Sequence, residues 1–535
     1  MRTILLSLLL LSAASTAAET FSYGGVSYSA DERGCAVTRP TEGSYSGSIV
    51  IPSEVEYGGV RHTVTTIADS AFAGSRVEEL TLPATLRRIG TGAFTGCSHL
   101  NKLHIADIRS WCAIEFAAPS SSPFAAHFYG SQQLWVGDTP TDSIAIEGTD
   151  VPADAFNGWE CIRKLTVGNG VASIGSRAFN ECTYLNTVRF GKDLRRIDAN
   201  AFGVCEWLRR VEVPSLSVWC AIEFATASSC PLSNSRVETF IAGGEAVTDL
   251  VIGDDCPAIG QYAFYQAPMI TSVTLGDGVT AMGRQAFFGC ANLRNVNLGN
   301  GLTAIPLGAF MQCKAIGAVD FGESVEEIGE SAFSNCESLA TLSLPRSLRS
   351  IGQTSFAFLQ SMVSLTVPSG VESLGQGCFS WCTSLEEVDL PSSLKKVGFA
   401  AFAFCDKLSK IDTGSTDAPE APSTNPPFSS KAYAAATLNV PRGSADSYRS
   451  APGWKNFTNI VEAGTSSAPA IGSDETSVTA SGGVLTINTH DGTEWTVADL
   501  DGRIIAHGSE NAVLSPSARI VIASVGGKSY KLVLR

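Results

Sequence analysis

Phenylalanine recurs along this chain every 23 residues, and that spacing constrains the fold more than any other feature. The series consists of Phe156, Phe179, Phe202, Phe264, Phe287, Phe310, Phe333, Phe356, Phe379 and Phe402. Phe72 and Phe94 extend it toward the N-terminus at a spacing of 22 residues. A unit this short cannot bury its own apolar face, so neighbouring units must stack into one continuous core. The repeat predicts a solenoid whose long, evenly spaced surface favours binding over catalysis.

Each repeat has a fixed internal pattern, which we number from its phenylalanine. Apolar residues fall at positions 6, 9, 11, 15 and 18, as in Leu339, Leu342, Leu344, Leu348 and Ile351 after Phe333. Positions 9 and 11 alternate with polar residues, which is typical of a strand with one buried face. We predict one short strand per coil, joined in a parallel sheet, with the phenylalanine plugging the coil. Position 19 is a glycine that we expect to adopt a positive φ: Gly329, Gly352, Gly375 and Gly398.

The full motif, Ile-Gly-x-x-Ala-Phe-x-x-Cys-x-x-Leu-x-x-Val-x-Leu-Pro, resembles the BspA-like leucine-rich repeat family. The resemblance covers about residues 60–415. It implies a curved leucine-rich repeat solenoid. It also implies a bacterial surface or secreted protein that adheres to host matrix or to other cells.

The repeat and the composition around it divide the chain into segments. We expect a signal peptide at 1–18, an N-terminal β cap at 19–60, a solenoid at 61–415 with longer inserts at 104–150 and 212–258, a C-terminal cap at 416–462, a linker at 463–477 and a C-terminal β-domain at 478–535. In the first cap, 21–26 and 47–52 are predicted strands. Both inserts contain Trp-Cys-Ala-Ile-Glu-Phe at an offset of 108 residues. This offset indicates a duplicated block, and we predict a longer coil with a hairpin in each insert.

The two ends of the chain suggest export. Arg2, an apolar stretch at 4–11 and small residues at 13–18 are typical of a secretory signal peptide. The segments 497–503 and 527–531 resemble the C-terminal sorting domain of the type IX secretion system. The Gly-Tyr usual near its penultimate strand is replaced by Ala-Arg-Ile at 518–520. A plain β-domain therefore stays open as the alternative.

Eight of the fifteen cysteines occupy position 3 of a repeat: Cys97, Cys182, Cys205, Cys290, Cys313, Cys336, Cys382 and Cys405. We interpret them as small buried side chains at one recurring place in the core. Disulfides are the alternative in an exported protein, and Cys230 with Cys256 is the first pair to test.

No motif in the sequence points to catalysis or to a cofactor. There is no His-Glu-x-x-His zinc pair, no Gly-x-Ser-x-Gly elbow and no phosphate-binding loop. The net charge of −15 argues against nucleic acid as a partner. We expect no cofactor, no metal and no transmembrane segment.

Two outward surfaces are candidate binding sites. Positions 8 and 10 flank the buried strand position and carry cations in early coils (Lys164, Arg189 and Arg210) and acids in later ones (Glu387 and Asp389). Solvated charge that binds no partner is the first interpretation of this sheet face, and a face that steers a charged partner is the alternative. Position 2 is aromatic in three successive coils, at Phe358, Trp381 and Phe404. These rings predict an apolar contact stripe, unless the cap around Trp454 covers them.

We therefore predict a non-enzymatic, monomeric, exported surface protein that binds a matrix or cell-surface protein, or a glycan. The alternatives are a surface hydrolase with dispersed catalytic residues and a structural spacer.

Overall fold

The computed structural model describes residues 19–31, 34–125 and 132–463, together with seven strands between residues 477 and 533. The chain divides into two compact units, Met1–Val461 and Glu462–Arg535. The predicted signal peptide and most of the predicted linker lie outside the described residues.

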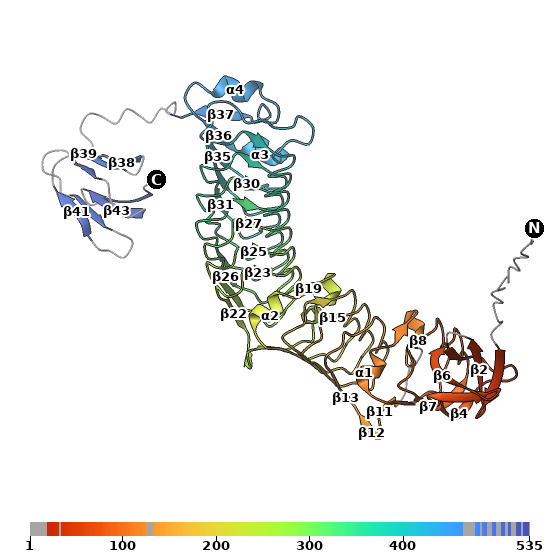
Figure 1. Ribbon diagram of the computed structural model, residues 1–535. Coiled ribbons are helices and arrows are strands. Elements are labelled where there is room, and N and C mark those ends of the chain that lie inside the picture. Colours follow the sequence, from red (N-terminus) through yellow and green to blue (C-terminus); the bar gives the residue numbers. More distant parts are fainter. Residues whose placement is uncertain are drawn as a thin grey trace, which may run out of the picture. The chain divides into compact units, whose positions relative to one another are not determined.

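The larger unit is a parallel β-solenoid in which the main strands of successive coils lie side by side (Figure 1). One sheet joins β13 (Ser143–Ile146), β14 (Lys164–Val167), β16 (Thr187–Phe190), β18 (Arg210–Val213) and β20 (Thr239–Ala242). The register follows the repeat, since Lys164 lies opposite Thr187 and Thr187 lies opposite Arg210. Position 9 is buried and positions 8 and 10 face outward, as the alternation predicts.

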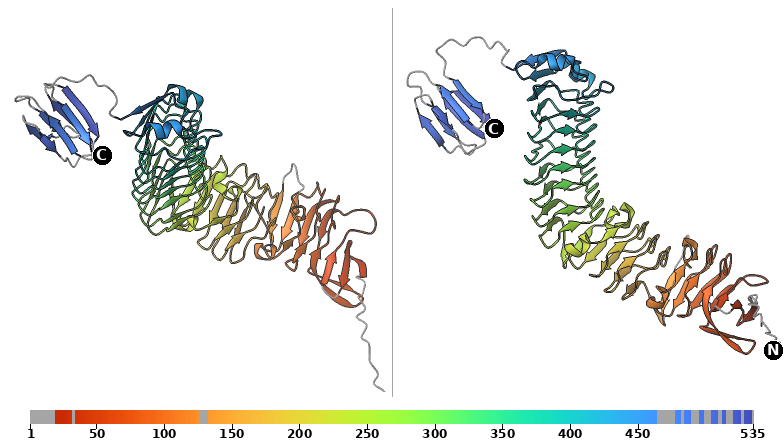
Figure 2. Two further views of the ribbon diagram at one scale, coloured as in Figure 1. Left: turned by 90° about the horizontal axis from the view of Figure 1, so that it is seen from above. Right: turned by 45° about the horizontal axis from the view of Figure 1, so that its top comes forward.

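Between Ser173 and Val397, each coil also has a second strand of two residues. These strands are β15 (Ser173–Ile174), β17 (Arg196–Ile197), β19 (Glu223–Phe224), β23 (Ala258–Ile259), β25 (Ala281–Met282), β27 (Ala304–Ile305), β29 (Glu327–Ile328), β30 (Ser350–Ile351), β32 (Ser373–Leu374) and β34 (Lys396–Val397). They pair in parallel ladders of their own. The structure thus adds a second ladder to the single strand per coil expected from the sequence (Figure 2).

The repeat phenylalanines form the core. Phe287 and Phe310 stack with ring centroids 5.1 Å apart and planes 1° from parallel, and both rings are fully buried. Similar stacking joins Phe156 to Phe179 and continues through the later coils. The buried, stacked rings confirm the predicted solenoid.

The main ladder is interrupted once in the second half of the array. The sheet of β22 (Asp249–Ile252), β24 (Ser272–Leu275), β26 (Asn295–Asn297) and β28 (Ala318–Asp320) ends there. The next sheet consists of β31 (Ser364–Thr366), β33 (Glu387–Leu390), β35 (Lys410–Thr413), β36 (Thr437–Val440) and β37 (Asn459–Glu462). Leu342 and Leu344 lie between them without forming a strand, although both pack against the core. The second ladder runs past this coil without a break.

The prediction for the position-19 glycines is wrong. None of them has a positive φ, but a Cβ on Gly375 would lie 2.5 Å from the carbonyl carbon of Gly352. Gly398 approaches Gly375 in the same way. Glycine is needed here because the coils approach each other closely. The positive φ falls two residues later, at Ser331, Thr354, Gly377 and Ala400.

The two inserts have the same architecture. The first contains α1 (Ile108–Trp111), β10 (Glu115–Phe116), a 3-10 turn (Pro119–Ser121) and the hairpin β11 (Gln133–Val136) and β12 (Thr139–Thr141). The second contains α2 (Leu216–Cys220), β19, 3-10 turns (Ala227–Ser229 and Pro231–Ser233) and the hairpin of β20 with β21 (Glu245–Ala246). The indoles of Trp111 and Trp219 donate to the carbonyl oxygens of Ala155 and Ala263, again 108 residues apart.

The N-terminal end of the solenoid differs in one respect from the prediction. Residues 21–26 are not one strand, because Gly24 and Gly25 both have positive φ and turn the chain from β1 into β2. The strands of this region are β1 (Glu19–Tyr23), β2 (Val26–Asp31), β3 (Gly34–Val37), β4 (Ser46–Val50), β5 (Glu54–Tyr57), β6 (Val60–Ile67), β7 (Arg76–Leu82), β8 (Arg88–Ile89) and β9 (Lys102–Ile105).

The C-terminal end of the solenoid is closed by α3 (Ser430–Ala435), α4 (Ala445–Ser450) and buried aromatic side chains. Trp454 is fully buried and donates from Nε1 to the carbonyl oxygen of Pro419 at 2.7 Å. Phe428 stacks on Phe402, the last phenylalanine of the repeat, so this segment continues the core and covers its end.

The smaller unit contains two antiparallel sheets (Figure 2). One has three strands, β38 (Ser477–Ser481), β39 (Val484–Asn488) and β42 (Ala512–Leu514). The other has four, β40 (Trp495–Ala498), β41 (Ile504–Gly508), β43 (Ile520–Val525) and β44 (Lys528–Val533).

Candidate functional site

The three aromatic residues at position 2 form a continuous exposed row, which we call the aromatic stripe. Trp381 stacks between Phe358 and Phe404, with ring centroids 5.7 and 4.0 Å away. Trp381 is 41% exposed and Phe404 is 51% exposed, while Phe358 is half-buried. The stripe therefore presents stacked ring surface to solvent, as its sequence pattern predicted.

Position 2 also imposes an uncommon backbone conformation. The φ angles of Phe358, Trp381 and Phe404 are 65°, 62° and 61°, in the left-handed region. Other coils place Gly96 or Asn335 there, and these residue types tolerate this conformation best. The larger residues Glu181, Val204, Gln266 and Gln312 share the positive φ at position 2. The left-handed conformation is therefore a property of the repeat and is not particular to the aromatic coils.

The C-terminal cap does not cover the stripe. Trp454 packs instead against Phe428, Tyr448 and Phe457, inside the end of the solenoid. The alternative that Trp454 buries the stripe is therefore not what the structure shows.

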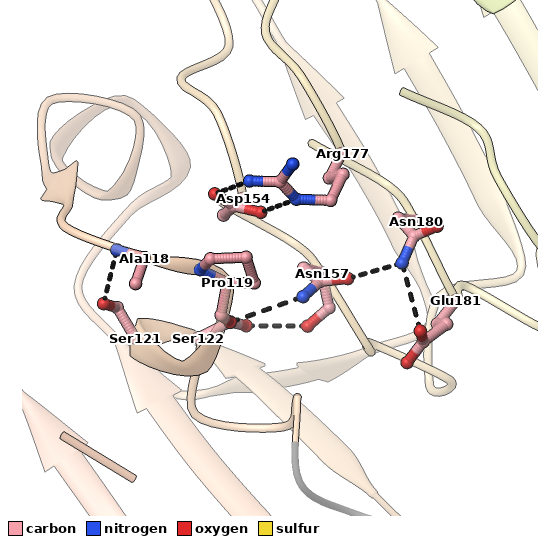
Figure 3. Close-up of polar contacts among 9 residues, drawn as sticks. All are labelled: Ala118, Pro119, Ser121, Ser122, Asp154, Asn157, Arg177, Asn180 and Glu181. Carbon is pink, nitrogen blue, oxygen red and sulfur yellow. Dashed lines mark hydrogen bonds and ion pairs between the residues drawn. The ribbon is translucent and has the colours of Figure 1, made fainter. Parts of the chain in front are cut away.

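The same edge of earlier coils carries a polar network instead of rings (Figure 3). Asp154, with a side chain only 3% exposed, accepts hydrogen bonds of 2.9 and 3.1 Å from Arg177. Asn180 donates to Asn157, which donates to the carbonyl oxygen of Pro119. These polar groups form hydrogen bonds with one another, so this part of the edge is polar where the later coils carry rings.

The basic part of the charged face is partly neutralised within the protein. Arg189 and Arg210 both bind the carboxylate of Glu212, which is 12% exposed. Burial opposes the charge of Glu212, but the hydrogen bonds from the two arginines outweigh it and lower its pKa. Lys164 is exposed on the same face. The sequence reasoning missed Glu212 because it compared cations between coils and not their acidic neighbours.

The acidic part of the face surrounds a lysine. Asp389 lies opposite Asp412, and Glu387 lies opposite Lys410, on adjacent strands β33 and β35. Lys410 contacts Asp412 at 3.0 Å, and this hydrogen bond raises the pKa of the lysine. The predicted basic and acidic residues thus occupy two separate stretches of the face, and the structure does not bring them together.

All fifteen cysteines are free thiols. Cys230 and Cys256, the pair singled out from the sequence, are not joined. Cys230 donates to the carbonyl oxygen of Ala263, whereas Cys256 shares a hydrogen bond with Cys220. The position-3 cysteines are buried, as predicted.

Tyr184 and Trp207 are exposed aromatic residues that the sequence reasoning missed. They are 42% and 46% exposed and occupy position 5 in neighbouring coils. Aligning the repeats at position 5 would have revealed them, since the other coils have no aromatic residue there.

The described residues contain neither a cluster of metal-ligating side chains nor a membrane-spanning helix. Among them, no cluster of three or more histidine, cysteine or acidic side chains could hold a metal ion. No described helix has the length and apolar character needed to cross a membrane.

Stacked coils, two parallel ladders and an interior row of phenylalanines define a leucine-rich repeat solenoid. The sequence matches the family described as BspA type Leucine rich repeat region (6 copies) over residues 59–116, 149–234, 238–360 and 304–418. These matches cover more than half of the chain, and the chain belongs to this family. No protein of curated function matches the sequence.

Several solved structures are similar to this chain. A leucine-rich repeat protein from Bacteroides ovatus is 20% identical, with coverage of 83% of this chain and 99% of its own, and a TM-score of 0.49. A leucine rich cell surface protein from Faecalibacterium prausnitzii is 19% identical, with coverage of 75% and 96% and a TM-score of 0.41. The pneumococcal vaccine antigen PcpA is 14% identical, with coverage of 84% and 99% and a TM-score of 0.41.

Proposed function

We propose that this protein is a non-enzymatic surface protein that binds a matrix or cell-surface protein through the outer edge of its solenoid. The aromatic stripe is the observation that carries the proposal. Three large rings stack at position 2 of successive coils, and two of them, Trp381 and Phe404, are 41% and 51% exposed. Exposed clusters of tryptophan and phenylalanine are typical of protein-binding hot spots.

Export is part of the same proposal. The charged, apolar and small-residue segments of 1–18 support secretion through a signal peptide. The resemblance of 478–535 to a type IX sorting domain supports, more narrowly, attachment at the cell surface by that route. Secretion and surface attachment can be separated by comparing where cells place the full-length protein and a variant that lacks residues 478–535.

Substitution of Trp381 tests the binding proposal. The full-length protein and its Trp381→Ala variant would be compared for binding to immobilised fibronectin, fibrinogen, collagen and laminin, with the melting temperature measured in parallel. Loss of binding at an unchanged melting temperature supports the proposal. Unaltered binding to a matrix protein that the parent binds would contradict it, as would failure of the parent to bind any cell-surface or matrix protein.

The charged face makes a second, separable contribution to this proposal. If it steers a partner, reversing Lys164, Arg189 and Arg210 and raising the salt concentration should both slow association. Glu387→Lys with Asp389→Lys is the matched change at the acidic stretch. If neither salt nor either set of substitutions changes the association rate, the charged face does not steer the partner. That outcome would not affect the proposal for the aromatic stripe.

A further inference from the structure

We propose that a groove at the entry to strands β14, β16 and β18 binds an acidic glycan, that is, a saccharide carrying carboxylate or sulfate groups. The groove has a volume of about 410 Å³ and is lined by Arg163, Lys164, Tyr184, Asn186 and Trp207. We call it the Tyr–Trp groove. It is formed by other coils than the aromatic stripe, so the inference goes beyond the proposed function and stands or falls separately.

The aromatic walls of the groove are not required by the repeat. Tyr184 and Trp207 occupy position 5, where later coils place Asn292, Ala315 or Ser338. Rings 42% and 46% exposed leave apolar faces in water. The face of an aromatic ring carries partial negative charge and attracts the C–H groups that line the face of a sugar ring. Two such rings on adjacent coils suit a ligand made of successive sugar rings.

Cations surround these rings. The guanidinium carbon of Arg163 lies 5.4 Å from the centroid of the Tyr184 ring. Those of Arg209 and Arg236 lie 5.8 and 6.0 Å from the Trp207 ring. Cation–π contact holds each guanidinium beside a ring, where its planar donors can pair with a carboxylate or sulfate group. In a chain of net charge −15, such a concentration of cations favours an anionic ligand.

Arg163 and Arg209 each have an acidic side chain nearby. Asp142 lies 3.9 Å from Arg163, with side chains 62% and 59% exposed. Glu238 lies 3.3 Å from Arg209, with side chains 71% and 29% exposed. The exposed pair of Asp142 and Arg163 contributes little stability, so an anion on the ligand can take the place of Asp142.

A neighbouring hollow supplies groups for sugar hydroxyls. It has a volume of about 490 Å³ and shares Arg163 and Tyr184 with the groove. Gln133, Thr141 and Glu160 also line it. Amide, hydroxyl and carboxylate groups together offer both donors and acceptors, which a hydroxyl-rich ligand requires.

A peptide fits this surface less well. Peptides that lie along a sheet bind by adding a strand to a free edge. The strands beside the groove have no free edge, because β14 pairs with β13 and β16, and β18 pairs with β16 and β20. Because no strand edge is free for a peptide, and because the exposed ring faces suit sugar rings, the groove favours an acidic saccharide over an acidic peptide.

Calorimetric titration of the full-length protein tests the assignment. The probes are heparin, which carries both sulfate and carboxylate groups, polygalacturonate, which carries carboxylates only, dextran, which is uncharged, and poly-L-glutamate, an acidic peptide. We expect binding of heparin, polygalacturonate or both, and none of dextran. Binding of heparin alone would indicate recognition of sulfate groups, and binding of polygalacturonate would indicate recognition of carboxylate groups. Trp207→Ala and Tyr184→Ala should each weaken that binding by roughly fivefold or more.

Matched variants keep the result interpretable. Trp207→Phe keeps a ring and should recover most of the affinity, and Ser338→Ala, at the exposed position 5 of a later coil, lies outside the groove and should leave it unchanged. Lys164→Glu changes an exposed residue and should weaken binding even where Trp207→Ala fails to fold. The inference is overturned if neither acidic glycan binds, if poly-L-glutamate binds as tightly, or if Trp207→Ala and Lys164→Glu both bind as the parent does.

Discussion

The thiol of Cys313 donates a hydrogen bond to the main-chain carbonyl oxygen of Phe287, with 2.9 Å between sulfur and oxygen. The same contact joins every position-3 cysteine to the phenylalanine one coil earlier, from Cys97 with Phe72 to Cys405 with Phe379. Cysteine at this place is thus a buried link between coils and not half of a disulfide. The cysteine side chain is small and apolar, and its S–H group is a weak hydrogen-bond donor, so it fits beside a carbonyl oxygen that is surrounded by apolar side chains.

Removing one link should lower stability measurably. We expect Cys313→Ala to decrease the free energy of unfolding by about 1–2 kcal/mol, because the variant loses a buried hydrogen bond and leaves a small cavity. Guanidinium denaturation followed by circular dichroism measures the change. Ser338→Ala, at an exposed position, serves as control and should shift the midpoint little. Equal midpoints for the two variants would mean that the link contributes nothing.

The buried thiols should make the protein sensitive to alkali. Burial raises the pKa of Cys205 to about 12 from an ordinary value of 9.0, and Cys230 is raised similarly. Above pH 9 the unfolded chain releases these protons while the folded protein retains them, so stability should fall as the pH rises from about 9 to about 12. Melting temperatures across this range provide the measurement. In Cys205→Val the decline should be shallower, and an identical decline in both proteins would contradict the assignment.

Gly375 and Gly377 of one coil require glycine for different reasons, so their substitution separates the cost of close coil approach from the cost of a positive φ. Gly375→Ala should cost about 2–3 kcal/mol, because the new Cβ would collide with the main chain of Gly352. Gly377→Ala should cost about 1 kcal/mol, because its φ is 57° but its Cβ would come no nearer than 3.3 Å to another atom. Chemical denaturation of both variants gives the comparison. The reverse order of cost would show that coil spacing is looser than the structure indicates.

Two tryptophans should differ sharply in their effect on folding. Trp454→Ala removes a fully buried side chain together with its hydrogen bond to Pro419, and should cost about 3–5 kcal/mol. Trp381→Ala loses stacking on one exposed edge and should cost about 1 kcal/mol or less. Thermal unfolding and limited proteolysis of residues 416–462 report the difference. If Trp454→Ala were as stable and as resistant as Trp381→Ala, the cap would not hold the end of the core.

The interior of this fold could be predicted from sequence because one period governs it. Phe287, Leu298 and Ile305 are buried at the positions that the repeat assigns to them. The expectation of a positive φ at Gly375 was wrong for a related reason. The repeat spacing shows that glycine is needed at this position. It does not show whether the backbone dihedral angle or the close approach of a neighbouring coil requires it. The partner of Gly375 is Gly352, 23 residues earlier, and that distance is set by the stacking of the finished coils.

The surfaces were harder to predict, since side chains from different repeat positions combine there. The position-2 rings were found because they fall in three coils in succession. The Tyr–Trp groove was missed because Arg163 and Arg209 come from position 7, whereas Tyr184 and Trp207 come from position 5. Only the folded coils bring those four side chains to one place.

The regular joints between coils, such as that between the coils of Phe287 and Phe310, repeat the same contacts: ring on ring, thiol on carbonyl oxygen and strand on strand. Deleting residues 310–332 would seat Phe333 directly on Phe287 and give the thiol of Cys336 the acceptor that Cys313 had used. A gene encoding such an array can gain or lose whole coils without altering the joints that remain. The reach of the protein is therefore adjustable during evolution in steps of one coil, roughly 5 Å.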